Sequence, residues 1–289
     1  MNLALFASGG LGLTCIRQLH SEGYRITVIF TDNRSKEIAA FAAQNQIPVF
    51  AGNPRKGEGL KFLESRKIVL DLVVSINYLF LIEQDLIDYP KIAAINFHGS
   101  LLPQYRGRTP HVWAIINNEK YTGISAHFIV EACDEGPVID QLKIEIKPDD
   151  TGGTLLSQFN QLYPGFVKKT IERFKTQNVI GTPQDQTKAS FFGKRTPDDG
   201  KIEWSWQRER IYNWVRAQAD PYPGAFCFYK NQKIVIDKIE FSTTGFTFAD
   251  PDGVILEGGR TPVVKTPDGA VKILKMRTEI NFEKGDCLQ

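Results

Sequence analysis

Short apolar runs alternate with amphipathic segments over the first half of the chain. Each apolar run is bounded by polar or turn-forming residues, as is typical of a buried strand, and each amphipathic segment has the spacing of a helix. Strands that alternate with helices need crossover connections, which favour parallel pairing. We therefore predict an α/β fold with a doubly wound, mostly parallel, Rossmann-like sheet. Its predicted elements are strands at 3–7, 26–30, 72–75 and 93–97, with helices at 13–22 and 36–46.

Two further runs, 123–130 and 138–146, alternate apolar and polar residues and lie close together, so they are predicted to be antiparallel edge strands. The segment 153–177 has the length of a long helix. Its apolar residues recur at intervals of three or four and should form one stripe that packs on the sheet. The residues of this stripe are Leu155, Phe159, Leu162, Phe166 and Thr170.

The pattern changes in the last third of the chain. A polar stretch after residue 180 predicts a linker, and a helix is predicted at 208–219. Short alternating runs with Gly and Asp turns then favour a small OB-like β-barrel domain. Its predicted strands are 225–229, 233–241, 253–257 and 270–275. We expect a larger domain over 1–180, a linker over 181–203 and the OB-like domain over 204–289.

Composition narrows the class of protein. The 289 residues carry a formal net charge of +2, which gives no support to a broad nucleic-acid-binding surface. Four scattered cysteines without C-x-x-C pairing suit a reducing compartment. No stretch approaches the roughly 20 apolar residues that span a bilayer. We expect a soluble, cytoplasmic protein that makes no contact with a membrane.

A glycine-rich loop, Ser8-Gly9-Gly10-Leu11-Gly12, follows the first predicted strand. Backbone N–H groups at the start of a helix form a natural anion site. A G-x-G-x-x-G fingerprint that starts at Gly10 fails, because its sixth position is Cys15, and NAD is therefore not expected. The loop is either a tight turn or a backbone surface that meets a sugar or phosphate.

The richest chemistry lies at the end of the fourth predicted strand. Asn96 and His98 are two residues apart, so their side chains point to the same face, at the edge where doubly wound sheets bind ligands. An amide can hold a developing oxyanion while an imidazole takes the proton of an attacking amine. Asp134, in a polar turn between the two edge strands, could bond a protonated imidazole and fix its orientation. The four histidines show no H-E-x-x-H pattern, which leaves no metal site.

This segment also carries a family resemblance. The string N-F-H-G-S-L-L-P-Q-Y-R-G over 96–107, followed by D-E-G-P over 134–137, resembles the formyltransferases that use N10-formyltetrahydrofolate. The resemblance continues through 192–200 and 213–226. It implies that Asn96, His98 and Asp134 are the catalytic trio and that N10-formyltetrahydrofolate is the formyl donor. It also implies a folate pocket walled by Tyr78, Leu79, Phe80, Leu101 and Leu102.

The charge of the C-terminal segment helps to predict which amine accepts the formyl group. From 205 to 289 the chain has 12 Lys plus Arg and 11 Asp plus Glu, too small an excess for an electrostatic tRNA platform. The loop at Ser8, Gly9 and Gly10 looks more like the branch of the family that formylates sugar nucleotides, as in surface polysaccharide (lipopolysaccharide) biosynthesis. We therefore expect a nucleotide-linked amino sugar as substrate. The alternatives are a methionyl-tRNA formyltransferase, a formyltetrahydrofolate hydrolase and a non-catalytic folate-binding protein.

A nucleotide sugar needs cations for its diphosphate and an aromatic wall for its base. Lys194, Arg195, Arg216 and Tyr222 could supply both, and Arg suits phosphate because its planar fork binds two oxygens. Arg195 and Arg216 could instead only pin the two domains together. Arg106 could contact the substrate or brace the active-site loop. The sequence leaves the sugar and the oligomeric state open, although the C-terminal barrel could carry a homodimer contact.

Overall fold

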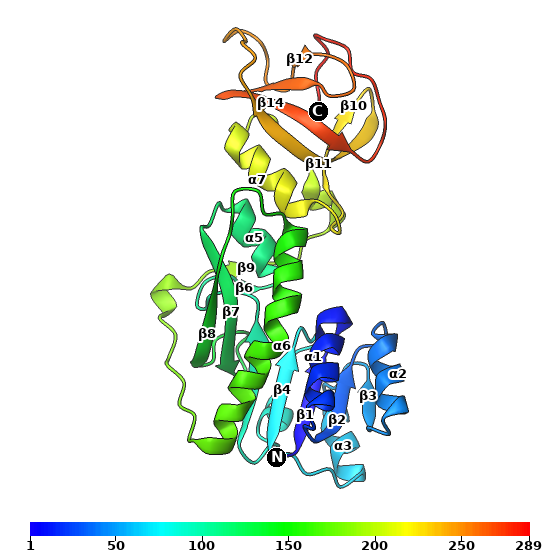
Figure 1. Cartoon of the computed structure of the whole chain (residues 1–289), viewed down its shortest axis with the longest axis vertical. Helices are drawn as coiled ribbons and strands as arrows, with labels where there is room; N and C mark the ends of the chain where they lie inside the picture. The colour runs from blue at the N-terminus through cyan, green and yellow to red at the C-terminus, as the bar shows by residue number, and fades with distance from the viewer. The chain divides into compact units, whose positions relative to one another are not determined.

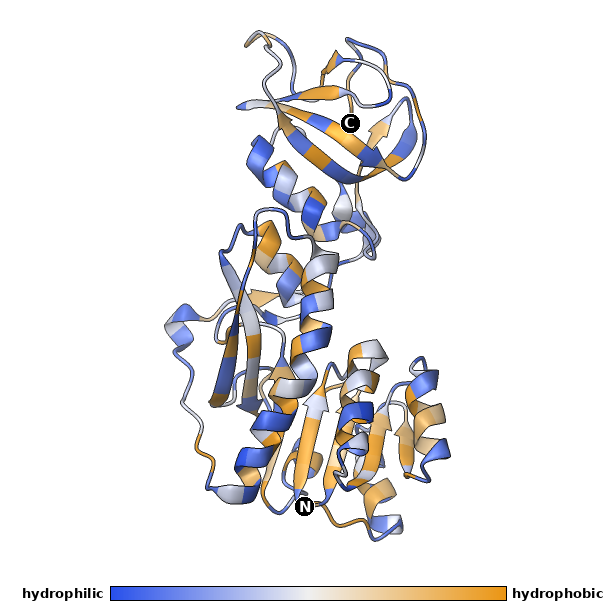
Figure 2. Ribbon diagram, in the orientation of Figure 1, coloured by the Kyte–Doolittle hydropathy of each residue, from blue (hydrophilic) through white to orange (hydrophobic).

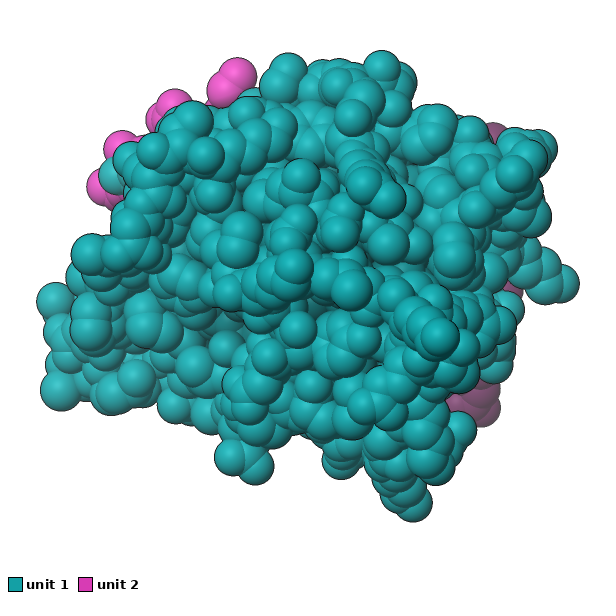
Figure 3. All heavy atoms as spheres, turned by 90° about the horizontal axis from the view of Figure 1, so that it is seen from below, with its two compact units in different colours: residues 1–107, 123–144, 158–192 teal, residues 108–122, 145–157, 193–289 magenta.

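The computed structural model describes all 289 residues (Figure 1). It divides into two compact units that interleave along the chain and are coloured separately in Figure 3. The first unit comprises 1–107, 123–144 and 158–192, and the second comprises 108–122, 145–157 and 193–289. The division of the sequence into domains at 181–203 stays a prediction.

The first unit is built on a seven-stranded sheet with the order β3-β2-β1-β4-β5-β7-β8. Neighbouring strands from β3 to β5 pair in parallel, and β5 pairs antiparallel with β7. The predicted α/β fold with a mostly parallel sheet is thus confirmed. The strands are β1 (Leu3–Ala7), β2 (Ile26–Thr31), β3 (Val49–Ala51), β4 (Leu72–Ile76), β5 (Ala93–His98), β7 (Tyr121–Phe128) and β8 (Val138–Glu145).

Helices cover both faces of this sheet. One buried cluster joins the strands to α1 (Gly9–Ser21), α2 (Lys36–Gln44) and α6 (Gly152–Thr176). A second cluster, on the opposite face, joins them to α3 (Glu58–Ser65) and α4 (Gln84–Ile87). The central strands are apolar almost throughout in Figure 2, because residues on both faces of a covered parallel sheet are buried.

The structure differs from the prediction at one helix boundary and on one helix face. The first helix starts at Gly9, four residues before the predicted start. A Cβ on Gly12 would lie 2.9 Å from the Cβ of Ala7, so this glycine lets the helix approach β1 and does not form a loop. The predicted stripe on α6 was wrong at Leu162, which is 39% exposed, while Tyr163 next to it is buried.

Several short elements were not predicted. They are β3, α3, α4, β6 (Arg106–Gly107), α5 (Pro110–Ile116), β9 (Phe191–Phe192) and β13 (Val263–Thr266), with two 3-10 turns at Gln186–Lys188 and Pro197–Gly200. Most are too short to show a hydrophobic period, and tertiary contacts define them.

The second unit contains α5, α7 (Arg208–Gln218) and a separate antiparallel sheet with the order β10-β11-β14-β13-β12. The predicted separate β-sheet at the C-terminus is present, and its OB-like identity stays a prediction. Its remaining strands are β10 (Ala225–Tyr229), β11 (Gln232–Ser242), β12 (Ile255–Glu257) and β14 (Gly269–Met276). No helix anywhere in the chain has the length and apolar character needed to cross a membrane.

Candidate active site

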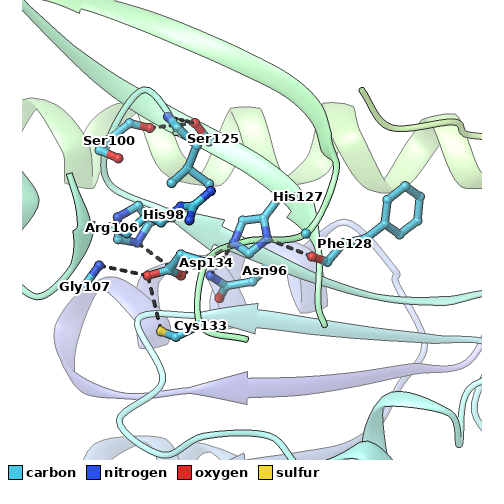
Figure 4. A network of polar contacts seen from close by, with 12 residues as sticks. Asn96, His98, Ser100, Arg106, Gly107, Ser125, His127, Phe128, Cys133 and Asp134 are labelled. Carbon is cyan, nitrogen blue, oxygen red and sulfur yellow. Dashed lines mark hydrogen bonds and ion pairs between the residues drawn. The ribbon is translucent and has the colours of Figure 1, made fainter. Parts of the chain in front are cut away.

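The predicted trio comes together in the first unit, at the carboxyl end of β5 (Figure 4). Asn96 and His98 lie on β5, and Asp134 lies in the turn between β7 and β8. The pairing of β5 with β7 sets His127 directly opposite Asn96. An amide, two imidazoles and a carboxylate therefore converge at the edge of the sheet where ligands bind in such folds.

The ring of His98 is held by two groups. Its Nε2 lies 2.8 Å from the carbonyl oxygen of Tyr105, and because that carbonyl can only accept, Nε2 carries the proton. Its Nδ1 lies 3.6 Å from Oδ1 of Asp134. In the neutral ring Nδ1 therefore has the lone pair, and it is this nitrogen that can take up a proton beside the carboxylate.

Asp134 is a buried carboxylate in a constrained turn. Its backbone is left-handed, with φ of 58°, and its side chain is 9% exposed. Burial raises the pKa of Asp134, but the positive charge that His98 carries when it is protonated, the contact with His127 (Nε2 to Oδ1, 3.7 Å) and the N–H of Gly107 outweigh burial and hold the pKa well below its usual value. The Gly107 N–H donates to Oδ2 over 3.0 Å, and the Cys133 thiol donates to the same oxygen over 3.4 Å. The side chain is thus an anion across the neutral pH range.

His127 fixes the orientation of the Asn96 amide. Nδ1 of His127 donates to the Phe128 carbonyl over 2.8 Å, so its Nε2 accepts from Nδ2 of Asn96 over 3.0 Å. The amide nitrogen of Asn96 has a second hydrogen that can be given to another acceptor. His127 was not among the catalytic residues predicted from the sequence. Its place in the predicted strand 123–130, beside 93–97, was the signal that could have identified it.

Internal hydrogen bonds fix the loop between β5 and β6. The Ser125 hydroxyl donates to the Ser100 carbonyl over 2.6 Å and accepts from the backbone N–H of Leu102 over 3.0 Å. The side chain of Gln141 donates to both the Leu102 carbonyl and the Ser125 hydroxyl. The carbonyl that orients His98 therefore belongs to a loop that is held by several hydrogen bonds.

Arg106, which was expected either to bind substrate or to brace this loop, is 2% exposed. Its guanidinium donates to the side-chain oxygens of Gln184 and Gln186 and pairs with Glu135 over 3.2 Å. These bonds favour the bracing role. Gln184 and Gln186 lie in the segment predicted to be a linker, so this segment contributes contacts to the site.

The residues expected to wall the folate pocket follow β4 and β5. The Tyr78 ring packs edge-on against Phe6 and Phe80, and its buried hydroxyl has no hydrogen-bond partner. Leu102 is buried and Leu79 is 41% exposed. Leu101, the remaining residue expected in this wall, is half-buried.

The glycine-rich segment 8–12, which forms the start of α1, lies at the carboxyl end of β1. Ser8 is buried and precedes the first helical residue, Gly9, whose N–H donates to the hydroxyl of Ser35 over 2.9 Å. Gly10 is exposed. The Asn77 side chain, which follows β4, donates to the Ser8 carbonyl over 3.1 Å. This hydrogen bond joins the ends of β1 and β4, the two strands at which the sheet order reverses direction.

The expected diphosphate-binding residues all belong to the second unit. Arg195 stacks on Trp113 and Trp214 at 4.9 and 4.4 Å. Arg216 is buried and donates to the carbonyls of Lys147 and Asp150. These contacts favour a bracing role for both arginines over phosphate binding. All of the residues they join lie within the second unit. The remaining two residues differ: Lys194 is exposed, and the Tyr222 hydroxyl lies 2.5 Å from Nε2 of His111.

The structure contains no group of three His, Cys, Asp or Glu side chains that could hold a metal ion. A parallel-dominated sheet with an oriented amide, an imidazole and a buried carboxylate at the end of one strand is the arrangement of an α/β enzyme that handles a proton beside a polar ligand.

Comparison with known proteins identifies the family. Residues 1–169 match the formyl transferase family and residues 194–282 match the formyl transferase C-terminal domain. The chain therefore belongs to the formyltransferase family, and it is a formyl-transfer enzyme. The predicted family resemblance is confirmed.

Solved structures share the fold at low sequence identity. WlaRD, described as a sugar 3N-formyltransferase in the presence of dTDP and 5-N-formyl-THF, is 19% identical, with a TM-score of 0.72 over 97% of this chain and 99% of that chain. An N-formyltransferase from Helicobacter canadensis, in complex with folinic acid and dTDP-3-aminofucose, is 18% identical, with a TM-score of 0.73 over 95% and 98%. Methionyl-tRNA formyltransferase from Clostridium thermocellum is 18% identical, with a TM-score of 0.57 over 84% and 94%.

Proposed function

We propose that this enzyme transfers a formyl group from N10-formyltetrahydrofolate to the amine of a nucleotide-linked amino sugar. The observation that carries the proposal is the contact between the buried ring of His98 and the Asp134 carboxylate at the end of β5, beside the oriented amide of Asn96. Transfer of an acyl group to an amine needs these three abilities together: to accept a proton, to stabilise the resulting cation and to donate to the acyl oxygen.

Each member of the trio has a distinct task. Nδ1 of His98 takes the proton that the attacking amine loses, because the other ring nitrogen is committed to the Tyr105 carbonyl. Asp134 stabilises the imidazolium through its ionised carboxylate. The Asn96 amide donates its second hydrogen to the acyl oxygen as the bond between the amine and the formyl carbon forms and negative charge develops there. The bond from the formyl carbon to N10 of the folate then breaks, and the proton held by His98 passes to N10 as tetrahydrofolate leaves.

The residues after β4 fit a folate. The rings of Tyr78 and Phe80 pack against each other and form an aromatic wall after β4. Folate is a flat, partly polar ring system that matches such a wall. When bound, N10-formyltetrahydrofolate supplies an activated formyl carbon.

Two observations support an amino-sugar nucleotide as acceptor. Two of the structural neighbours are sugar N-formyltransferases whose ligands are dTDP and dTDP-3-aminofucose. The near-zero charge balance of residues 205–289 argues against a tRNA platform. In this proposal the N-terminus of α1, with Ser8, Gly9 and Gly10, contacts the sugar nucleotide.

A panel of acceptors tests the proposal. The purified protein is incubated with N10-formyltetrahydrofolate and, separately, with UDP-, dTDP- and GDP-linked amino sugars, charged initiator tRNA or buffer alone. We expect a mass gain of one formyl group on at least one amino-sugar nucleotide. Formylation of the tRNA alone, or release of formate with no acceptor, would replace the proposal with the corresponding alternative.

The proposal also covers the compartment of the reaction, the fold of the C-terminal sheet and the pathway of the product. All four cysteines are free thiols, which suits a reaction in a reducing cytoplasm. We further propose that the five-stranded sheet of the second unit is an OB-like barrel that could carry a homodimer contact, and that the product enters surface polysaccharide biosynthesis.

A further inference from the structure

The segment that follows α6 returns to the turn that carries Asp134. A bridge between Val138 and Thr182 brings it beside the start of β8, and two residues later Gln184 reaches the turn. The mechanism proposed above gives Gln184 no task, yet its side chain contacts two parts of the site.

The carboxamide of Gln184 is bonded on both sides. Its Nε2 donates to the carbonyls of Asp134 and Gly136 over 2.8 and 2.7 Å. Its Oε1 accepts from Nη2 and Nε of Arg106 over 2.8 and 3.2 Å. A guanidinium can only donate and a carbonyl can only accept, so the amide can take only this orientation. Glutamine is the residue whose side chain offers a two-hydrogen donor and an acceptor at this length.

The residues on each side of Arg106 hold the catalytic groups. The Tyr105 carbonyl accepts from His98. The Gly107 N–H donates to Asp134, as Figure 4 shows. Gln184 ties the Arg106 side chain to the backbone of the Asp134 turn. The two supports of the trio are thereby fixed relative to each other through one carboxamide.

We propose that Gln184 is a positioning residue that sets the separation between the His98 ring and the Asp134 carboxylate. This inference rests on the proposed function of those two side chains. A glutamine that only stabilised the fold would affect stability and leave turnover per folded molecule unchanged. A positioning residue lowers kcat, because a small displacement of a catalytic group costs a large factor in rate.

The substitution Gln184→Glu separates the two halves of the contact. A carboxylate keeps the bonds from Arg106 but sets an oxygen against the carbonyls of Asp134 and Gly136, so it breaks only the contact with the turn. Gln186→Glu is the matched control. Gln186 bonds the same guanidinium through its oxygen over 3.0 Å, which a carboxylate retains, and the change in charge is identical.

We expect Gln184→Glu to lower kcat by at least tenfold, with the KM values for folate and acceptor within about threefold of the wild type. Gln186→Glu should stay within about twofold of the wild-type kcat. Equal kcat values in the two variants would overturn the proposal, as would a change in KM alone. Thermal unfolding of each variant shows whether turnover is being compared between folded proteins.

A second readout does not depend on which acceptor the enzyme uses. In a crystal structure of the Gln184→Glu variant, we expect the distance between Nδ1 of His98 and Oδ1 of Asp134 to exceed its present 3.6 Å. An unchanged distance refutes the positioning role, whatever the acceptor. If the wild type formylates only tRNA or only releases formate, the amino-sugar proposal fails, and Gln184 is tested with that reaction instead.

Discussion

The two histidines of the site are different tautomers and have different partners. His98 holds its proton on Nε2 and faces Asp134 with Nδ1, whereas His127 holds its proton on Nδ1 and orients Asn96 with Nε2. Both tautomers follow from backbone carbonyls, which accept and never donate. Residue types and the two-residue spacing predicted Asn96, His98 and Asp134 as candidates. The tautomers could not be predicted, because they depend on which carbonyls fold against each ring.

Asp134→Asn should lower kcat by about 100-fold or more, since the amide keeps the shape of the side chain but cannot stabilise an imidazolium. The pKa of Asp134 lies below its usual value, so the carboxylate stays ionised above an ordinary pKa of 3.8 and protonates only as the pH falls through the lower, folded value. The comparison is therefore made at pH 7, where the wild-type side chain is an anion. Steady-state kinetics check it, and a kcat within about threefold of the wild type would contradict it.

The hydrophobic pattern predicted the long helices and strands better than the short ones. The alternation of apolar runs identified four of the five parallel strands, because a buried strand has a continuous apolar run. The three-residue β3 and the seven-residue α5 were missed, since so few residues show no clear period. The start of α1 was missed because glycine is a poor helix former, and Gly12 is required there by its close packing against Ala7 of β1.

The two faces of α6 give a test of packing. Ile171 is fully buried and Leu162 is 39% exposed. Ile171→Ala should reduce the free energy of unfolding by about 2–5 kcal/mol, because it leaves a cavity in the core. Leu162→Ala should cost less than about 1 kcal/mol. Urea unfolding of the two variants measures the difference, and equal losses would mean that the helix packs on another face.

His111, a buried side chain on α5, should make the free energy of unfolding depend on pH. Burial lowers the pKa of His111 from 6.5 to about 4. The folded protein then binds fewer protons than the unfolded chain, so stability falls as the pH drops from about 6.5 to about 4, by about 3 kcal/mol in total. We expect His111→Gln to remove most of this pH dependence, whatever its effect on stability at pH 7. Parallel slopes for variant and wild type in urea unfolding between pH 4 and 7 would refute it.

The whole molecule belongs to the formyltransferase family over both of its matched regions. Fold class and family could be predicted from the sequence, because the strand–helix alternation and the motif from Asn96 to Gly107 are local in the chain. The interleaving of the two compact units could not, because it depends on long-range contacts of residues 108–122 and 145–157. The same holds for the segment around Gln184, whose polar composition resembles a linker although its side chains support the site.

The central claim is that the His98 ring takes the proton of the attacking amine. The most direct measurement compares wild type and His98→Ala for formyl transfer to the acceptor found in the panel, together with equilibrium binding of folate. We expect turnover to fall by about 10²–10⁴-fold while the Kd for folate stays within about threefold. Turnover close to that of the wild type in His98→Ala would contradict the account.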